Sequence, residues 1–177
     1  MKKTLATALL VTCSQYALSE DTAKNATTTP KTEVPEGFYM GGGLSFNSID
    51  AGSIFSGADR ETASGLQIFA GLPIPNSIKG FETYAEAGYF QTSEFDFSGK
   101  EERVRGIWGA GVLQRDLNEI DPNLYALARI GLELGDDDGV FMGMGAGYRI
   151  TPKVEVRAEF LNKDLLTSYQ LNAVIRF

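Results

Sequence analysis

The side chains that could do acid–base chemistry in this 177-residue chain are carboxylates, and their spacing argues against such a role. Glu82 and Glu86 lie four residues apart, as do Glu155 and Glu159, with Arg157 between the second pair. Four residues of an extended strand span roughly 13 Å, which is beyond the separation of two catalytic carboxylates. We therefore expect these residues to form structural salt bridges.

Other reactive groups are scarce in the sequence. It contains no histidine, which excludes Ser–His hydrolysis, histidine general bases and histidine metal sites. Its one cysteine, Cys13, falls in a segment that we expect to be removed. The acidic run 136–138 lacks the glycine and the distal glutamate of a calcium loop, which favours a solvated turn. We predict no catalytic residue, no cofactor and no metal site.

Residues 37–177 alternate between apolar and polar types, which predicts β-strands with two different faces. The last ten residues are typical: one face carries Tyr169, Leu171, Ala173, Ile175 and Phe177. About ten residues is also the length of a tilted strand that crosses a bilayer. The eight predicted strands are 37–47, 63–72, 80–91, 102–114, 123–134, 139–150, 153–161 and 168–177.

The order of these segments predicts the domain organisation. Short turns rich in Pro, Gly, Asp and Asn connect most of the strands in sequence, which favours an all-β, eight-stranded antiparallel up-and-down transmembrane β-barrel at 37–177. Residues 1–19 have the two lysines, short apolar stretch and small residues of a signal peptide. Residues 20–36 show no periodicity and are predicted to be a flexible periplasmic leader.

Alternation alone does not say which face of the barrel points outward. Glycine is frequent on the polar face, and the interior of an eight-stranded barrel is only just wide enough for side chains. Enclosed charges must also be paired, and the polar face carries nearly equal numbers of both signs. We therefore predict a lipid-facing apolar wall and a polar lumen. The predicted lumen charge network is Glu82, Glu86, Arg103, Arg105, Arg129, Glu133, Arg149, Glu155, Arg157, Glu159 and Arg176.

Aromatic residues gather at the ends of the predicted apolar face, as they do at membrane–water interfaces. One predicted girdle is Phe38, Phe81, Tyr148 and Phe177, and the other is Phe46, Tyr89, Phe160 and Tyr169. Trp108 departs from this pattern, because it lies on the predicted lipid-facing side near the middle of the segment 102–114.

The chain resembles the small outer-membrane barrels of OmpA/OmpX type, including opacity-protein-like surface proteins. The resemblance rests on the signal Met1–Ser19, the opening strand Gly37–Leu44 and the terminal strand Tyr169–Phe177. It implies that Tyr169 and Phe177 form an assembly signal for the barrel-assembly machinery. It also implies a location in the bacterial outer membrane, in contact with its lipid and with lipopolysaccharide.

These observations favour a non-enzymatic outer-membrane protein with a largely plugged lumen. Its role would be structural or adhesive, with a host or surface ligand bound by the loops at 48–62 and 92–101. Two alternatives stay open: a narrow passive channel for small solutes or ions, and a soluble, lipocalin-like barrel with an apolar pocket. The net charge of −7 argues against nucleic acid as a partner, since phosphate binding needs clustered cations.

Overall fold

The computed structural model describes residues 34–50, 60–97, 100–136, 138–163 and 166–177. Val34–Phe177 form one compact unit. The predicted signal peptide at 1–19 lies outside the described residues, and so does most of the predicted leader at 20–36. Within the described ranges, no helix is long and apolar enough to span a membrane.

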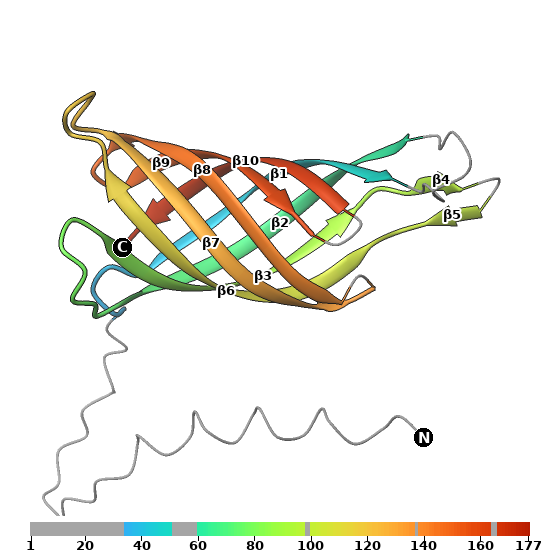
Figure 1. Ribbon diagram of the computed structural model, residues 1–177, viewed down its shortest axis with the longest axis horizontal. Coiled ribbons are helices and arrows are strands. Elements are labelled where there is room, and N and C mark those ends of the chain that lie inside the picture. The colour runs from blue at the N-terminus through green and yellow to red at the C-terminus, as the bar shows by residue number, and fades with distance from the viewer. Residues whose placement is uncertain (1–33, 51–59, 98–99, 137, 164–165) are drawn as a thin grey trace, which may run out of the picture. The chain divides into compact units, whose positions relative to one another are not determined.

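Eight long strands form a closed antiparallel barrel, in which they tilt together around the axis (Figure 1). They are β1 (Tyr39–Asp50), β2 (Arg60–Ile74), β3 (Glu82–Thr92), β6 (Arg105–Asp116), β7 (Leu124–Gly135), β8 (Gly139–Thr151), β9 (Val154–Asn162) and β10 (Leu166–Arg176). Their order around the barrel is β1-β10-β9-β8-β7-β6-β3-β2, so each strand lies beside its neighbours in the chain and β1 meets β10. The prediction of an eight-stranded up-and-down barrel is confirmed.

A small hairpin interrupts this order between β3 and β6. It consists of β4 (Phe95–Phe97) and β5 (Lys100–Glu102), which pair with each other and project beyond the barrel (Figure 1). We call this end of the barrel the hairpin end. The opposite end, where β1 begins and β10 finishes, is the terminal end.

The seam between the first and last strands closes the sheet completely. Tyr39 pairs with Arg176 at the terminal end, Leu44 with Leu171 in the middle and Ile49 with Leu166 at the hairpin end. Closure leaves no free strand edge, so the backbone N–H and C=O groups of the wall are bonded between strands. A spanning sheet requires this, because hydrocarbon offers no partner to an unpaired peptide group.

The outward face of the wall is apolar and its inward face is polar, which is the reverse of a water-soluble barrel. The outward side chains are apolar, and Leu66 and Ile68 are about two-thirds exposed, at 64% and 66%. The inward face instead buries charge, and the Arg157 side chain is 1% exposed. A water-soluble barrel would bury the apolar set, so the alternative of a soluble, lipocalin-like barrel is wrong.

One strand has the opposite orientation from the prediction. In β6, Trp108 and Val112 are buried in the lumen, whereas Ile107, Gly109 and Gly111 face outward. Arg105 belongs to the outward set too. The outward face was predicted wrongly because both faces of this segment are apolar or small in the middle, so alternation does not distinguish them.

Small residues on the lumen face make room for aromatic rings. A Cβ added at Gly71 would overlap the ring of Tyr39, and one added at Gly147 would overlap the ring of Tyr125. Both tyrosines are fully buried. The outward Gly111 differs, because a Cβ there would meet no atom within 4 Å. Glycine is therefore required at specific lumen positions to seat a large neighbour.

Candidate functional site

The centre of the lumen is a carboxylate held by two guanidinium groups. Glu86 on β3 points inward, and its Oε1 lies 2.6 Å from Nη1 of Arg157 on β9. Its Oε2 lies 3.4 Å from Nη1 of Arg129 on β7. The Tyr39 hydroxyl on β1 donates a third hydrogen bond to Glu86, at 2.5 Å. Four strands therefore meet through one carboxylate, with opposite charges in direct contact.

A polar branch runs from this centre toward the hairpin end. Arg129 Nε lies 3.2 Å from Oε2 of Glu159, and Arg129 Nη2 donates to Gln170 at 2.7 Å. Gln67 donates to Gln170 and to Asn172, at 2.7 Å each. Asn172 in turn donates to Glu159 at 3.0 Å, which closes a ring across β2, β7, β9 and β10 made of four hydrogen bonds and the Arg129–Glu159 ion pair.

A second branch runs from the centre toward the terminal end. Arg157 Nη2 and Arg176 Nε both contact Glu155, at 3.2 Å each. Arg176 also donates to the Tyr84 hydroxyl at 3.3 Å, and this hydroxyl donates to Glu82 at 2.6 Å. The two branches together join polar groups along the lumen from one end to the other.

Aromatic rings pack against the buried cations and fill the space between them. The Arg157 guanidinium lies 4.8 Å from the ring centroid of Tyr39. The Arg129 guanidinium lies 5.0 Å from that of Trp108 and 5.7 Å from that of Phe141. These cation–π contacts supply attraction where water is excluded.

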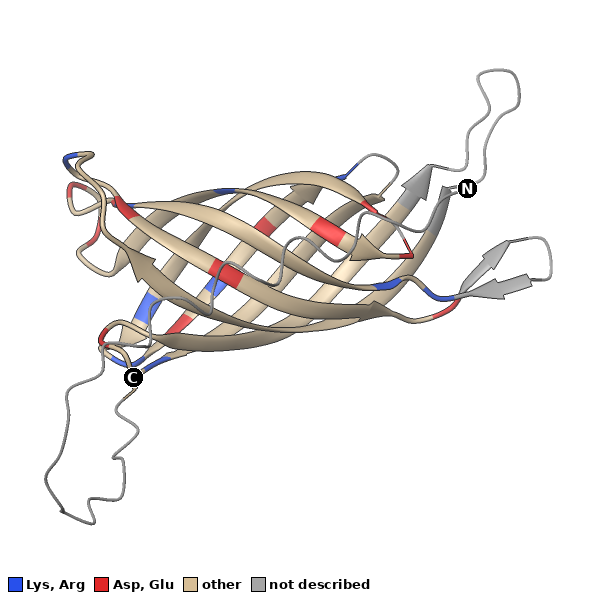
Figure 2. Cartoon of the chain, turned by 90° about the horizontal axis from the view of Figure 1, so that it is seen from below, with Lys and Arg blue, Asp and Glu red and all other residues tan. Residues whose placement is uncertain are grey.

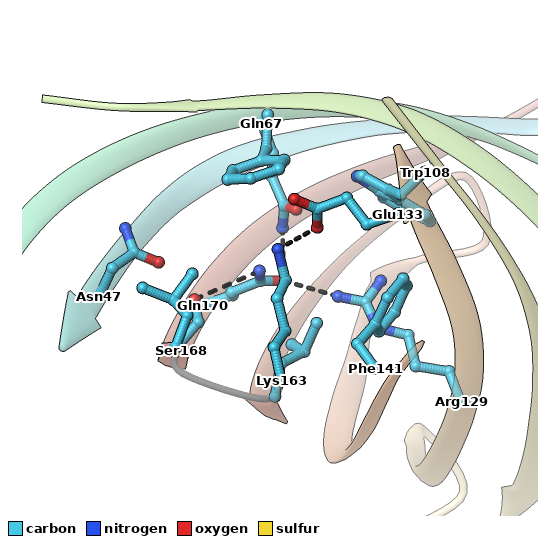
Figure 3. A pocket seen from close by; sticks show the side chains of 12 residues that line it. Asn47, Gln67, Trp108, Arg129, Glu133, Phe141, Lys163, Ser168 and Gln170 are labelled. Carbon is cyan, nitrogen blue, oxygen red and sulfur yellow. Dashed lines mark hydrogen bonds and ion pairs between the residues drawn. The ribbon is translucent and has the colours of Figure 1, made fainter. Parts of the chain in front are cut away.

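At the hairpin end the lumen holds only a very small cavity (Figure 3). Its volume is about 10 Å³, which is room for about one water molecule. Lys163 reaches across it and pairs with Glu133, while its ammonium group lies 4.0 Å from the ring centroid of Phe90. Figure 3 shows Lys163, Glu133, Gln170 and Arg129 converging on this space. Side chains plug the lumen here.

The charges enclosed in the lumen balance. The buried carboxylates are Glu86, Glu133, Glu155 and Glu159. The cations that contact them are Arg129, Arg157, Lys163 and Arg176. Among the residues that the structure describes, four negative groups thus face four positive groups, which is the condition for keeping charge in a site of low dielectric constant. In Figure 2, Lys, Arg, Asp and Glu appear as isolated coloured bands on strands that are otherwise tan.

The structure places seven of the eleven predicted network residues in the lumen: Glu86, Arg129, Glu133, Glu155, Arg157, Glu159 and Arg176. Glu82 is exposed at the terminal end, where its carboxylate accepts hydrogen bonds from Tyr84 at 2.6 Å and from Gln114 at 3.4 Å. Arg149 lies near the same end, where it pairs with Asp116 at 2.7 Å and stacks over Tyr125.

Arg103 and Arg105 are outside the lumen, and their assignment to the network is wrong. Their side chains are 53% and 69% exposed, and they pair with Glu94 and Asp136 at the hairpin end. The error follows from the inverted face of β6. At the end of a spanning strand an outward arginine reaches polar surroundings, so the lumen is not needed to hold its charge.

Several lumen residues were not predicted. The tyrosines at 39, 84 and 125 and the amides at 67, 114, 170 and 172 carry no formal charge, so a search for charge on the polar face passes over them. The strand pattern does place six of them on the polar, inward face; Gln114 is the exception, because it lies in β6, whose faces were predicted the wrong way round. Lys163 follows the end of β9, where periodicity gives no direction.

The predicted aromatic girdles lie near the barrel ends, in clusters formed by neighbouring strands. The ring centroids of Phe160 and Tyr169 are 5.2 Å apart, and Phe46 is the register partner of Tyr169. At the terminal end, the centroids of Phe38 and Phe177 are 5.7 Å apart. The other members are Phe81, which is partly buried, and Tyr89 and Tyr148, which are exposed.

Comparison with known proteins identifies the family. Residues 5–177 match the outer membrane protein beta-barrel domain, and the chain belongs to this family. The protein is therefore a transmembrane β-barrel of the bacterial outer membrane. No curated protein matches the chain in sequence.

Solved structures share the fold at low sequence identity. A de novo designed transmembrane β-barrel matches with a TM-score of 0.51 and 14% identity, over 82% of this chain and 99% of the design. Neisserial surface protein A (NspA) also matches with a TM-score of 0.51, at 18% identity over 80% of this chain and 96% of NspA. The attachment invasion locus protein Ail of Yersinia pestis aligns at 11% identity with a TM-score of 0.32, over 81% of this chain and all of Ail.

Proposed function

We propose that this protein is a non-enzymatic outer-membrane barrel with a closed lumen, which acts through its outer surface and loops. Its role is structural or adhesive, through the predicted loops at 48–62 and 92–101 on an extracellular hairpin end; residues 51–59 and 98–99 of these segments lie outside the described residues. The β4–β5 hairpin supports this orientation, because the longer loops of outer-membrane barrels are extracellular and their periplasmic turns are short. The absence of histidine from the sequence supports a role without catalysis.

The observation that carries the proposal is the filled lumen. Paired charges, amides and aromatic rings occupy its section, and the cavity at the hairpin end has room for about one water molecule. An open pore of the same strand number would need a continuous water path past Glu86, Arg129 and Arg157. A surface role needs only a rigid wall that holds its loops apart.

Assembly in the membrane is part of the same proposal. Tyr169 and Phe177 on the outward face of the last strand serve as the signal read by the barrel-assembly machinery. Both side chains are exposed, at 59% and 58%, so they are accessible on the strand that closes the barrel. The lipid-facing aromatic clusters then settle at the two interfaces of the bilayer, in contact with lipid and lipopolysaccharide.

Planar-bilayer recording tests the closed lumen against the channel alternative. We expect the refolded protein to show no stepwise conductance. Arg129→Ala removes a plug side chain, so it should destabilise the barrel and introduce conductance steps. Glu82→Gln, at the exposed terminal end, is the matched control and should change neither property. Steady ion conduction by the unaltered protein would assign it to the channel class instead.

A further inference from the structure

We propose that the outward surface at the hairpin end binds one phosphorylated lipid, with its phosphate at Arg103 and Arg105 and an acyl chain in the adjoining apolar groove. The chemistry fits the phosphorylated glycolipid of the outer leaflet, the lipid A part of lipopolysaccharide. The choice of leaflet rests on the orientation given under the proposed function.

Arg103 and Arg105 stand side by side on the lipid side of the wall. Val104 between them turns inward and packs against the lumen core, so the two arginines share the outward face. Arg103 precedes β6 and Arg105 is its first residue, and both side chains are exposed. Ile107, the next residue on that face, is exposed at lipid level. The two guanidinium groups therefore lie just beyond the apolar band, at the height of lipid head groups.

The existing partners of these arginines leave donors for a ligand. Arg105 Nε lies 3.9 Å from Asp136 Oδ2, and that oxygen also accepts a hydrogen bond from the backbone N–H of Arg105. Arg103 Nη2 bonds Glu94 at 2.6 Å, but both side chains are more than two-fifths exposed. Exposed pairs of this kind are weak, and a guanidinium group presents five N–H donors in a geometry that suits phosphate.

An apolar groove begins next to the arginines. It has a volume of about 650 Å³ on the outside of β1, β2 and β3, and Leu44, Leu66, Ile68 and Tyr89 form its floor. Arg103 lies at its end. Because this groove faces the hydrocarbon of the membrane, its natural occupant is an acyl chain.

A polar hollow of about 430 Å³ adjoins the groove. It is lined by Gln91, Glu94, Arg103, Arg105 and Asp136, so it shares Gln91 and Arg103 with the groove.

The strand register connects the two hollows. Leu44 pairs with Leu66, Leu66 with Gln91 and Gln91 with Arg105, which forms one row across four strands. The polar hollow holds two arginines and two carboxylates, and its exposed guanidinium groups are the donors that a phosphate would engage next to the apolar groove. Free phosphate would fill only the polar half.

The experiment measures lipid binding to the full chain, refolded in non-ionic detergent. Diphosphoryl lipid A is titrated in, and the bound lipid is counted by native mass spectrometry. We expect one lipid A per protein, and an apparent affinity about tenfold or more lower for the double variant R103Q/R105Q. Chemically dephosphorylated lipid A should bind the unaltered protein as weakly as diphosphoryl lipid A binds the double variant.

Arg115→Gln is the matched control, because Arg115 is an exposed, outward arginine at the other end of the same strand. It should leave lipid A binding unchanged. Leu66→Ser should weaken lipid A binding, while inorganic phosphate at millimolar concentration should not displace the lipid. Equal loss in Arg115→Gln, no loss in R103Q/R105Q, or displacement by inorganic phosphate would overturn the proposal.

The closed lumen is tested separately in the same samples. Heat-modifiable migration shows that each variant is folded. A protein that retains lipid A yet conducts ions in a planar bilayer would contradict the closed lumen and leave the lipid site standing. A closed barrel that ignores lipid A would do the reverse.

Discussion

Arg157 is a buried cation that joins several groups in the interior of this barrel. It contacts the carboxylates of Glu86 and Glu155, is shielded from solvent and lies against the ring of Tyr39. Burial makes the contribution of such a group asymmetric. A complete set of partners roughly offsets the cost of desolvation, whereas removal of one member leaves an opposite charge alone in a site of low dielectric constant.

Arg157→Met should therefore lower the free energy of unfolding by about 3–5 kcal/mol, since it leaves buried carboxylates without their cation. Urea unfolding in detergent, followed by the fluorescence of Trp108, measures this change. Arg103→Met is the control, because it breaks only an exposed pair and should cost about 0–1 kcal/mol. Equal effects from the two variants would show that the lumen charges are not coupled.

A second prediction at this scale concerns glycine. Gly147→Val should destabilise the barrel by about 1–3 kcal/mol or more, because the new side chain would occupy the space of the buried Tyr125 ring. Gly111→Val places the same side chain on the open outward face and should have little effect. The same urea titration compares them, and a larger loss for Gly111→Val would contradict the assigned faces.

At the scale of the strand, the alternation of side chains was enough to predict most of the fold. Seven of the eight barrel strands have the predicted face outward, including β10, although its apolar residues Leu166 and Val174 are buried on the inward face. The prediction failed in β6, because Ile107 and Trp108 are both large and apolar and Gly109 and Gly111 carry no polarity. Arg103 and Arg105 added a misleading signal, since their side chains lie on the exposed outer surface at the hairpin end rather than in the lumen.

Which charged side chains pair with each other in the lumen could not be predicted from the sequence, for a different reason. Parity predicts that Glu86 and Arg157 both point inward, but which charges meet depends on the stagger of β3 against β9 around a closed sheet. Lys163 was missed entirely because it comes from a connection, whose direction no periodicity sets.

The lipid-facing wall should tolerate charge according to depth. Leu171 lies on the outward face at mid-strand, so Leu171→Arg should cost about 2–4 kcal/mol, because the guanidinium enters the hydrocarbon. Thr62→Arg, on the outward face near the hairpin end, should cost about 0–1 kcal/mol. Reversible unfolding in phosphatidylcholine vesicles measures both. If the two costs were equal, the assignment of β10 to the membrane would be wrong.

At the scale of the whole molecule, the architecture is independent of any particular sequence. A designed barrel shares the fold at 14% identity, and a Neisserial surface protein shares it at 18%. The shared fold fixes the closed wall, and the outer-membrane location follows from the family to which the chain belongs. What distinguishes one such protein from another lies in its loops and in outward features such as the Arg103–Arg105 pair.

The mature form of the molecule gives a further prediction. If residues 1–19 are a signal peptide cut after Ser19, the protein recovered from the outer membrane should begin at Glu20. Intact-mass measurement of the purified protein checks this directly. Substituting Lys2 and Lys3 with glutamate should slow export and cause the precursor to accumulate, whereas the same changes at Lys24 and Lys31 should not.

The wide sequence separation of the lumen contacts has a consequence for biosynthesis. Glu86 and Arg157 are separated by 71 residues in the sequence, and Gln67 and Asn172 by 105. The first strand of the barrel pairs with the last. A polypeptide cut short by a premature stop codon would thus carry charged side chains without their ion-pair partners. Its sheet would also have two edges with unpaired backbone groups. We expect such a fragment to be degraded by proteases, because without its last strand the sheet cannot close into this barrel.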